Sequence, residues 1–146
     1  MIASVHLADI GVRSAFAVVR KVPPPGSIKG LRHADVALAA PLRGGASLPL
    51  PQLGRAGLIA FWDDDAALDR FLDDHPLAAE LASGWHLRLA PLRAHVTWPG
   101  LPSDVPAQRD VDHEGPVAVL TLARLRASQA IRFVRTSAKA EASAVA

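Results

Sequence analysis

Histidines are the first candidates for chemistry in this chain of 146 residues, which contains no cysteine and no tyrosine. Without cysteine, disulfides, thiolate metal sites, iron–sulfur clusters and a cysteine nucleophile are excluded. The histidines stand at positions 6, 33, 75, 86, 95 and 113. No two of them have the close spacing of a zinc motif, so a zinc site is not expected. A b-type haem needs only one neutral imidazole and leaves no spacing signature.

His95 is the first candidate ligand, because it lies on an expected strand near Trp98. His33, on another expected strand, is the second candidate, and His6 could also face the interior of the sheet. For each of them the alternative is a structural histidine, partly buried and held by a hydrogen-bond partner. The sequence leaves both interpretations open.

The three tryptophans, Trp62, Trp85 and Trp98, fall near the ends of expected strands. Tryptophan is frequent around apolar ligands, so these residues are candidates for a substrate pocket, although ordinary core packing would also explain them. His86 directly follows Trp85, and neighbouring strand residues point to opposite faces of a sheet.

Three consecutive aspartates, Asp63, Asp64 and Asp65, could be taken for a metal-binding cluster. Helix capping is the simpler interpretation, because carboxylates in a first turn bind free backbone N–H groups and suit the helix dipole. They therefore predict the start of an amphipathic helix.

The order of expected elements over residues 2–98 is β-α-β-β-α-β, an α+β pattern of the ferredoxin-like type. Strands are expected at 2–8, 31–42, 56–62 and 84–97, and helices at 12–21 and 64–74. We expect a four-stranded antiparallel sheet with both helices on one face. The expected core consists of Phe16, Val19, Leu58, Phe61, Leu68, Phe71 and Leu87.

An internal repeat follows a proline-rich linker at 99–115. Residues 117–135 can be laid over residues 2–20 without a gap, so that Ala118, Val134 and Arg135 match Ala3, Val19 and Arg20. The chain is therefore expected to contain a first repeat at 1–98 and a partial second repeat, one strand and one helix with a tail, at 116–146. It would then be a two-repeat protein truncated at its C-terminus. Such a strand lacks partners, so a homodimer is expected.

Two segments carry a resemblance to a known family. Residues 56–62 with 64–68 are similar to the unit of strand, tryptophan, acidic cap and helix in dimeric α/β-barrel proteins. Residues 91–100, PLRAHVTWPG, resemble the segment that closes the first repeat of spheroidene monooxygenase-like proteins, and residues 116–121 resemble the opening of their second repeat. The resemblance implies two ferredoxin-like repeats, oxygenation of a carotenoid and haem as the cofactor.

The expected function is therefore that of a haem-dependent monooxygenase acting on an apolar substrate such as a carotenoid. Haem iron would be held by His95 or His33, beside a pocket formed by Trp62, Trp85 and Trp98. The alternative is a non-catalytic α/β-barrel module that binds a small apolar molecule or serves in assembly.

Charge and hydropathy restrict the remaining classes. The formal net charge is only +2, and the basic residues are scattered among acids, so no nucleic-acid partner is expected. No apolar run approaches the roughly 20 residues of a membrane span. The N-terminal residues lack the pattern of a signal peptide, so a cytoplasmic location is expected.

Overall fold

The computed structural model describes residues 1–39, 53–95, 101, 105–108, 110–120 and 129. Its helices and strands follow one another as β1 (Ile2–Asp9), α1 (Val12–Val19), β2 (Leu31–Leu38), β3 (Arg55–Trp62), α2 (Asp65–Asp74), α3 (Pro76–Leu81) and β4 (Trp85–Leu89). The chain divides into two compact units, residues 1–39 with 51–111 and residues 40–50 with 112–146. These helices and strands all belong to the first unit.

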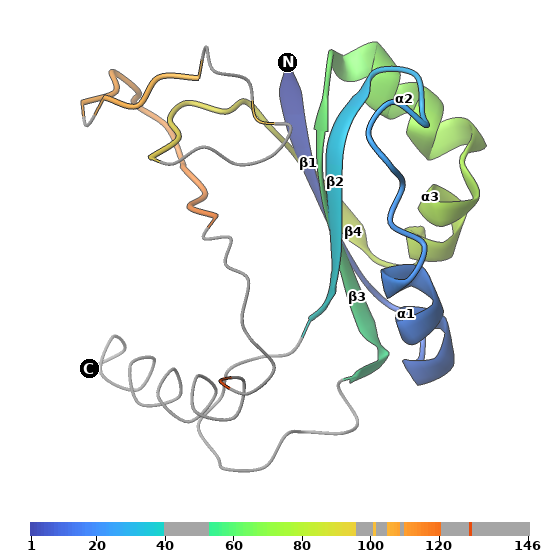
Figure 1. Ribbon diagram of the computed structural model, residues 1–146. Coiled ribbons are helices and arrows are strands. Elements are labelled where there is room, and N and C mark those ends of the chain that lie inside the picture. The colour runs from blue at the N-terminus through green and yellow to red at the C-terminus, as the bar shows by residue number, and fades with distance from the viewer. Residues whose placement is uncertain (40–52, 96–100, 102–104, 109, 121–128, 130–146) are drawn as a thin grey trace. The chain divides into compact units, whose positions relative to one another are not determined.

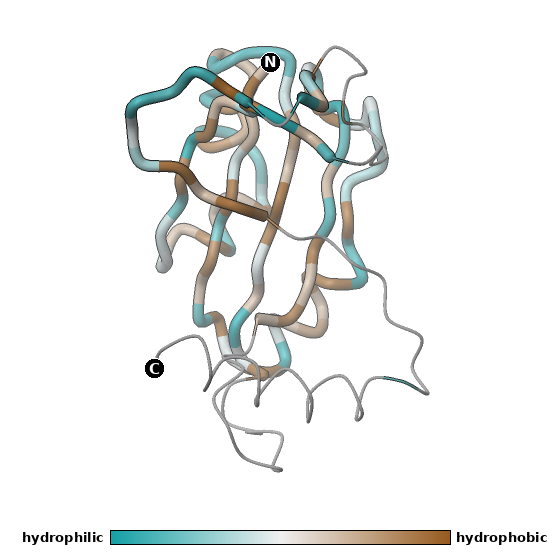
Figure 2. Tube along the Cα trace, turned by 90° about the vertical axis from the view of Figure 1, so that its left-hand side faces the viewer, coloured by the Kyte–Doolittle hydropathy of each residue, from teal (hydrophilic) through white to brown (hydrophobic). Residues whose placement is uncertain are grey.

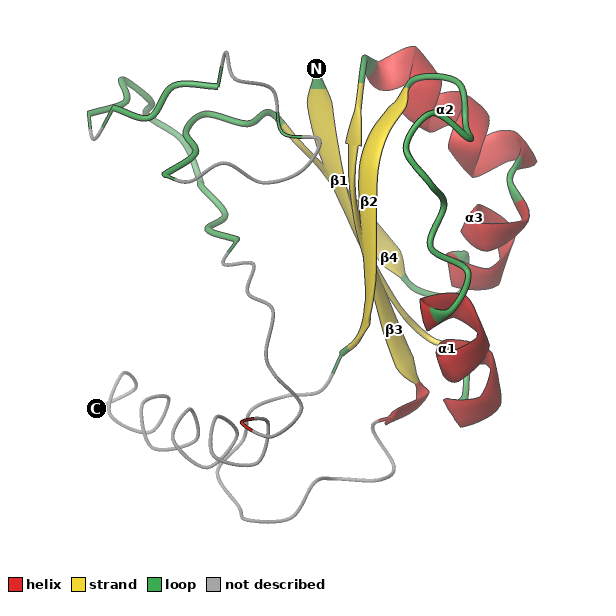
Figure 3. Cartoon of the chain, in the orientation of Figure 1, coloured by secondary structure: helices red, strands yellow, loops and turns green. Residues whose placement is uncertain are grey.

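The four strands form one antiparallel sheet in the order β2-β3-β1-β4. All three helices lie on the same face of this sheet (Figures 1 and 3). The expected four-stranded antiparallel sheet of an α+β protein is thereby confirmed, as is the placement of the helices on one face.

The core lies between the sheet and the helices. Alternation along β1 turns Ser4, His6 and Ala8 toward the helices and the residues between them to the other face. The largest fully buried side chains of the core are those of Trp62, Phe71, Leu58, Leu68 and Val18.

The start of α2 follows the expected capping pattern. Asp64 is the N-cap residue, and its Oδ1 accepts a hydrogen bond from Ala67 N at 2.8 Å. Asp65 lies in the first turn, where its charge suits the helix dipole. Asp63 instead pairs with Arg32 of β2, with 2.7 Å between Nε and Oδ1. The aspartate run is therefore explained by capping and an ion pair.

Three elements end two or more residues before the expected position. β2 ends at Leu38, and its predicted end at residue 42 lies outside the described residues. α1 ends at Val19, two residues before its predicted end at residue 21. β4 ends at Leu89 and residues 90–95 form no strand, so the strand predicted to reach residue 97 is wrong over that part. Pro91 gives the physical reason, because proline cannot donate a ladder hydrogen bond.

Four of the expected core residues, Leu58, Phe61, Leu68 and Phe71, are buried. Phe16 and Leu87 are not in the core, since they are 40% and 48% exposed. α1 turns Ala15 and Val18 toward the sheet instead, so Phe16 faces away and Val19 is only half-buried. Leu87 lies on the edge strand β4, on the face that the helices do not cover.

Most of the expected second repeat, residues 121–146 apart from residue 129, lies outside the described residues. Residues 117–120, where the strand of that repeat is expected to begin, are described; they are exposed and form no strand. The domain boundaries at 98 and 116 stay predictions. Within the described part of the chain, no helix has the length and apolar character needed to cross a membrane.

Candidate functional site: the open face of the sheet

The sheet face without helices is the candidate site, and we call it the open face. Residues opposite each other in an antiparallel pair lie on the same face, so the register assigns its members. They are Ala3, Val5 and Leu7 of β1; Gly57, Ile59 and Phe61 of β3; His33, Asp35 and Ala37 of β2; and Trp85, Leu87 and Leu89 of β4. Figure 2 looks onto this side of the sheet, where hydrophobic stretches recur along the strands.

Exposure on the open face increases along the strands, away from Ala3 and Phe61, and is greatest on β4. Ala3, Phe61 and His33 are buried, although they lie opposite to the helices. Trp85 and Leu87 are 51% and 48% exposed. Two large apolar side chains beside the half-buried Val5 and Leu7 form an apolar strip at the edge of the sheet, and such strips mark interaction sites.

His33 is the polar group at the opposite edge of the open face. Its Nε2 lies 2.9 Å from Oδ2 of Asp35, and only 11% of the histidine side chain is exposed. The two residues are separated by one position on β2, so both side chains point to the same face. Metal-bound histidines are commonly oriented by such a carboxylate. In this arrangement Nδ1 is the ring nitrogen that would face a metal.

The other sequence candidates are not brought together with His33. His95 lies in an exposed bend after β4 rather than on a strand. Trp62 is buried on the helix side, where its Nε1 donates to Ser4 Oγ at 2.8 Å, whereas Trp85 belongs to the open face. Trp98 lies outside the described residues. Among the residues that the structure describes, no group of three or more histidine, aspartate or glutamate side chains could hold a metal ion.

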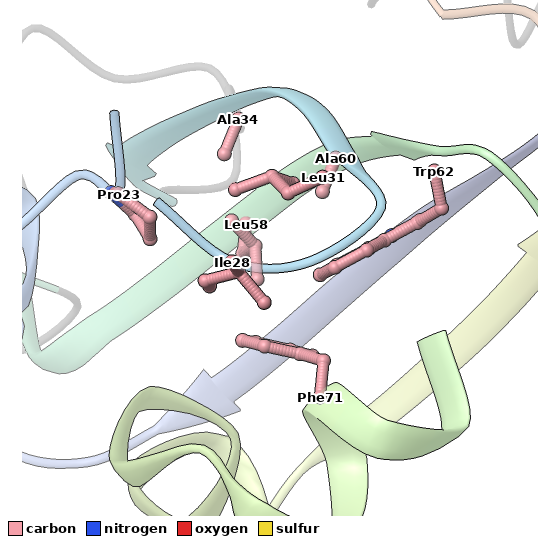
Figure 4. A pocket seen from close by; sticks show the side chains of 8 residues that line it. All are labelled: Pro23, Ile28, Leu31, Ala34, Leu58, Ala60, Trp62 and Phe71. Carbon is pink, nitrogen blue, oxygen red and sulfur yellow. The ribbon is translucent and has the colours of Figure 1, made fainter. Parts of the chain in front are cut away.

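A small apolar hollow lies on the helix side of the sheet, between the loop that precedes β2 and the core (Figure 4). Its walls include Pro23, Ile28, Leu58, Trp62 and Phe71. It encloses about 140 Å³, part of it open to solvent, and is too narrow for a water molecule. Ligand sites usually measure about 300–1,000 Å³, so this hollow does not fit a haem.

His6 is a buried polar residue whose surroundings sequence reasoning missed. It is 3% exposed on the helix side of β1, and its Nε2 lies 3.0 Å from Ser4 Oγ. Ser4 Oγ already accepts from Trp62, so its own proton can go to His6 Nε2, which suits a neutral ring. Burial, and secondarily the charge of His86, lower the pKa of His6 to about 4.

The ring of His6 packs between a histidine and a phenylalanine. It stacks on His86, with ring centres 5.3 Å apart and planes at 24°, and meets the ring of Phe71 edge-on at 5.9 Å. His86 is the direct cross-strand partner of His6. The contact depends on the register between β1 and β4, and a single sequence does not reveal that register.

The described part of the chain thus offers an apolar sheet face with one carboxylate-held imidazole, and a separate pair of stacked histidines behind it. No family model matches this chain, and no curated protein and no solved structure matches it.

Proposed function

We propose that residues 1–98 form a ferredoxin-like unit of the dimeric α/β-barrel type, which serves in assembly by pairing its open face with that of a second copy. The element order β-α-β-β-α-β, the strand order β2-β3-β1-β4 and the one-sided placement of the helices support the fold assignment. The resemblance of residues 56–68 to that class agrees with it.

The exposure of Trp85 and Leu87 is the observation that carries this proposal. Each keeps about half of its surface in water, on a face whose neighbouring side chains on β1 are also apolar. An antiparallel sheet can leave one face in water when that face is polar, but this one is not. Covering these side chains gives roughly 25 cal/mol for every Å² removed from water.

The shape of the surface favours another sheet over a small molecule. Sites for small molecules are concave and enclose most of the ligand, whereas the open face is a sheet surface. Two sheets can pack face to face at a spacing of about 10 Å with their side chains interdigitated. A two-fold axis would place the Trp85–Leu87 strip of each copy against the sheet of the other.

Light scattering on the full chain at neutral pH tests the proposal. We expect a dimer for the unaltered protein and a monomer for Trp85→Lys, because the lysine would place a charge in the interface. Phe16→Lys is the matched control, since Phe16 is similarly exposed but lies on α1, on the other side of the sheet. A monomeric unaltered protein, or a Trp85→Lys variant that stays dimeric with an unchanged circular dichroism spectrum, would refute it.

A second candidate function is that of a cytoplasmic haem-dependent monooxygenase acting on an apolar substrate such as a carotenoid. The Asp35-held imidazole of His33 at the edge of the open face favours it. Haem, when bound, would supply oxygen activation. His33 would ligate the iron, and the apolar side chains of the face would contact the substrate. His95 stays the other proposed iron ligand, and it would have to reach the iron from the exposed bend after β4.

Haem titration separates the two candidates. Haem binding through His33 predicts a Soret band near 400 nm that saturates at one haem per chain and is lost in His33→Ala. His113→Ala is the control, because His113 is exposed and lies in the other unit. A band that persists unchanged in His33→Ala would remove His33 as the ligand, and the absence of saturable binding would exclude this function.

A further inference from the structure

The edge strand β4 is held to the sheet on one side only. Among the described strands it pairs with β1 alone, through the register Ala3 to Leu89 and Leu7 to Trp85. Four of its five residues are exposed. Segments with few buried contacts open locally at a lower free-energy cost than the rest of a domain.

The contact between His6 and His86 lies at the centre of this pairing. The pair His6–His86 lies between the pairs Val5–Leu87 and Leu7–Trp85 in the register. The side chains of those neighbouring pairs point to the open face, whereas the rings of His6 and His86 stack on the helix side. Stacked neutral imidazoles attract one another through dispersion, whereas two imidazolium rings in the same place repel. A proton on each ring therefore converts the central contact of β1 and β4 from attractive to repulsive.

We propose that the His6–His86 pair makes β4 an acid-released strand: neutral rings hold β4 on β1, and protonation detaches it while the rest of the sheet stays folded. The charged and titratable groups around the pair do not offset this repulsion. Arg88, two positions after His86 on β4, forms ion pairs with Asp65 and Asp69 of α2, so the charges of these two carboxylates are balanced by Arg88. Glu80 of α3 pairs with Lys21.

The remaining elements around His6 contribute mainly apolar groups. α2 presents the ring of Phe71, and β3 places Leu58 opposite His6. His75, between α2 and α3, stacks on the ring of Phe71 with ring centres 5.1 Å apart, and its Nδ1 accepts from Leu77 N at 3.2 Å. His75 therefore offers no negative charge to His6.

The direction of the effect follows from proton linkage. The pKa of His6 is about 4 in the folded sheet and about 6.5 when the ring is in water, so the open form binds the proton more tightly. The closed form is therefore fully favoured above pH 6.5 and loses stability as the pH falls toward 4. If opening fully hydrates His6, the opening equilibrium rises about 30-fold between pH 7.5 and 5.

Amide hydrogen exchange of the full chain at pH 7.5 and pH 5 tests the proposal. After correction for intrinsic exchange, we expect protection of the β4 amides to fall by up to about 30-fold, while protection of β2 and β3 changes far less. In His6→Leu the fall should disappear, whereas the control His113→Leu should retain it. Should His6→Leu fail to fold, imidazole titration by NMR in His86→Leu serves instead, where the pKa of His6 should rise because the neighbouring charge is gone.

Two results would overturn the proposal. An equal loss of protection in β3 would mean global acid unfolding, and an undiminished fall in His6→Leu would remove the histidine as the cause. If the proposed dimer through the open face is correct, acid release of β4 would also dissociate it, because Trp85 and Leu87 lie on this strand. That consequence rests on the proposed function, and light scattering at pH 7.5 tests the dimer separately from strand release.

Discussion

Replacing Phe71 by alanine should be among the most destabilising single changes in this domain. The Phe71 ring is 1% exposed and packs against Trp62, with ring centres 4.9 Å apart, as well as against His6 and His75. It also forms part of the wall of the apolar hollow. Loss of the ring would enlarge a space that is already present.

The magnitude follows from burial. A buried phenylalanine that becomes alanine typically costs about 3–5 kcal/mol in free energy of unfolding, because apolar contacts are lost and a cavity remains. Phe16 undergoes the same chemical change but is 40% exposed. Full burial of such a side chain contributes about 1.5–3 kcal/mol, so Phe16→Ala should cost only about 1–2 kcal/mol.

Urea denaturation of the two variants, followed by circular dichroism at pH 7.5, measures this difference. We expect Phe71→Ala to be less stable than Phe16→Ala by roughly 2–3 kcal/mol, which corresponds to a melting temperature lower by roughly 10–20 °C in a domain of this size. Equal stabilities would show that the helix-side core does not centre on Phe71. The pKa of His6 should also rise toward its ordinary value in Phe71→Ala, because the opened space hydrates the ring.

Two further substitutions test individual hydrogen bonds. Ser4→Ala should lower the free energy of unfolding by about 1–3 kcal/mol, because the buried Nε1 of Trp62 would lose its acceptor. The control Ser27→Ala, at an exposed hydroxyl, should lower it very little. Equal losses of stability in urea denaturation would contradict the role of Ser4. Asp64→Ala should lower the free energy of unfolding by about 1 kcal/mol, because the N-cap of α2 is lost. Asp74→Ala, at the other end of α2, should be neutral or slightly stabilising. The reverse order of melting temperatures would be inconsistent with capping.

Local sequence signals were sufficient for most of the fold. The aspartates before α2 and the apolar run of β3 fixed those elements to within a residue, because capping and strand alternation act on neighbouring residues. The sequence predicts the end of β4 too late, because the alternation of apolar residues continues past Pro91 whereas the strand ends at Leu89. The sequence does not decide which face of α1 is buried, because an apolar stripe can be drawn through either Phe16 or Val18.

The candidate site depended on information that one sequence does not contain. The register of β1 with β4 decides that His6 meets His86 and that Trp85 joins the open face, and it is set by tertiary packing. His33 was recognised as a candidate from its place on a strand, but its pairing with Asp35 becomes visible only once both side chains are on one face. Trp62 and Trp85 were grouped by residue type, and the sheet separates them.

The central position of β1 has a consequence for the order in which the sheet can form. β1 is hydrogen-bonded to β3 on one side and to β4 on the other, so residues near the start of the chain must meet partners as far along it as Leu89. Contacts between such distant residues carry a high loop-closure entropy and slow folding. β2 and β3 are closer in sequence and pair without β1. During synthesis on the ribosome the β2–β3 pair can therefore form first, while β1 waits for the second half of the sheet to be translated.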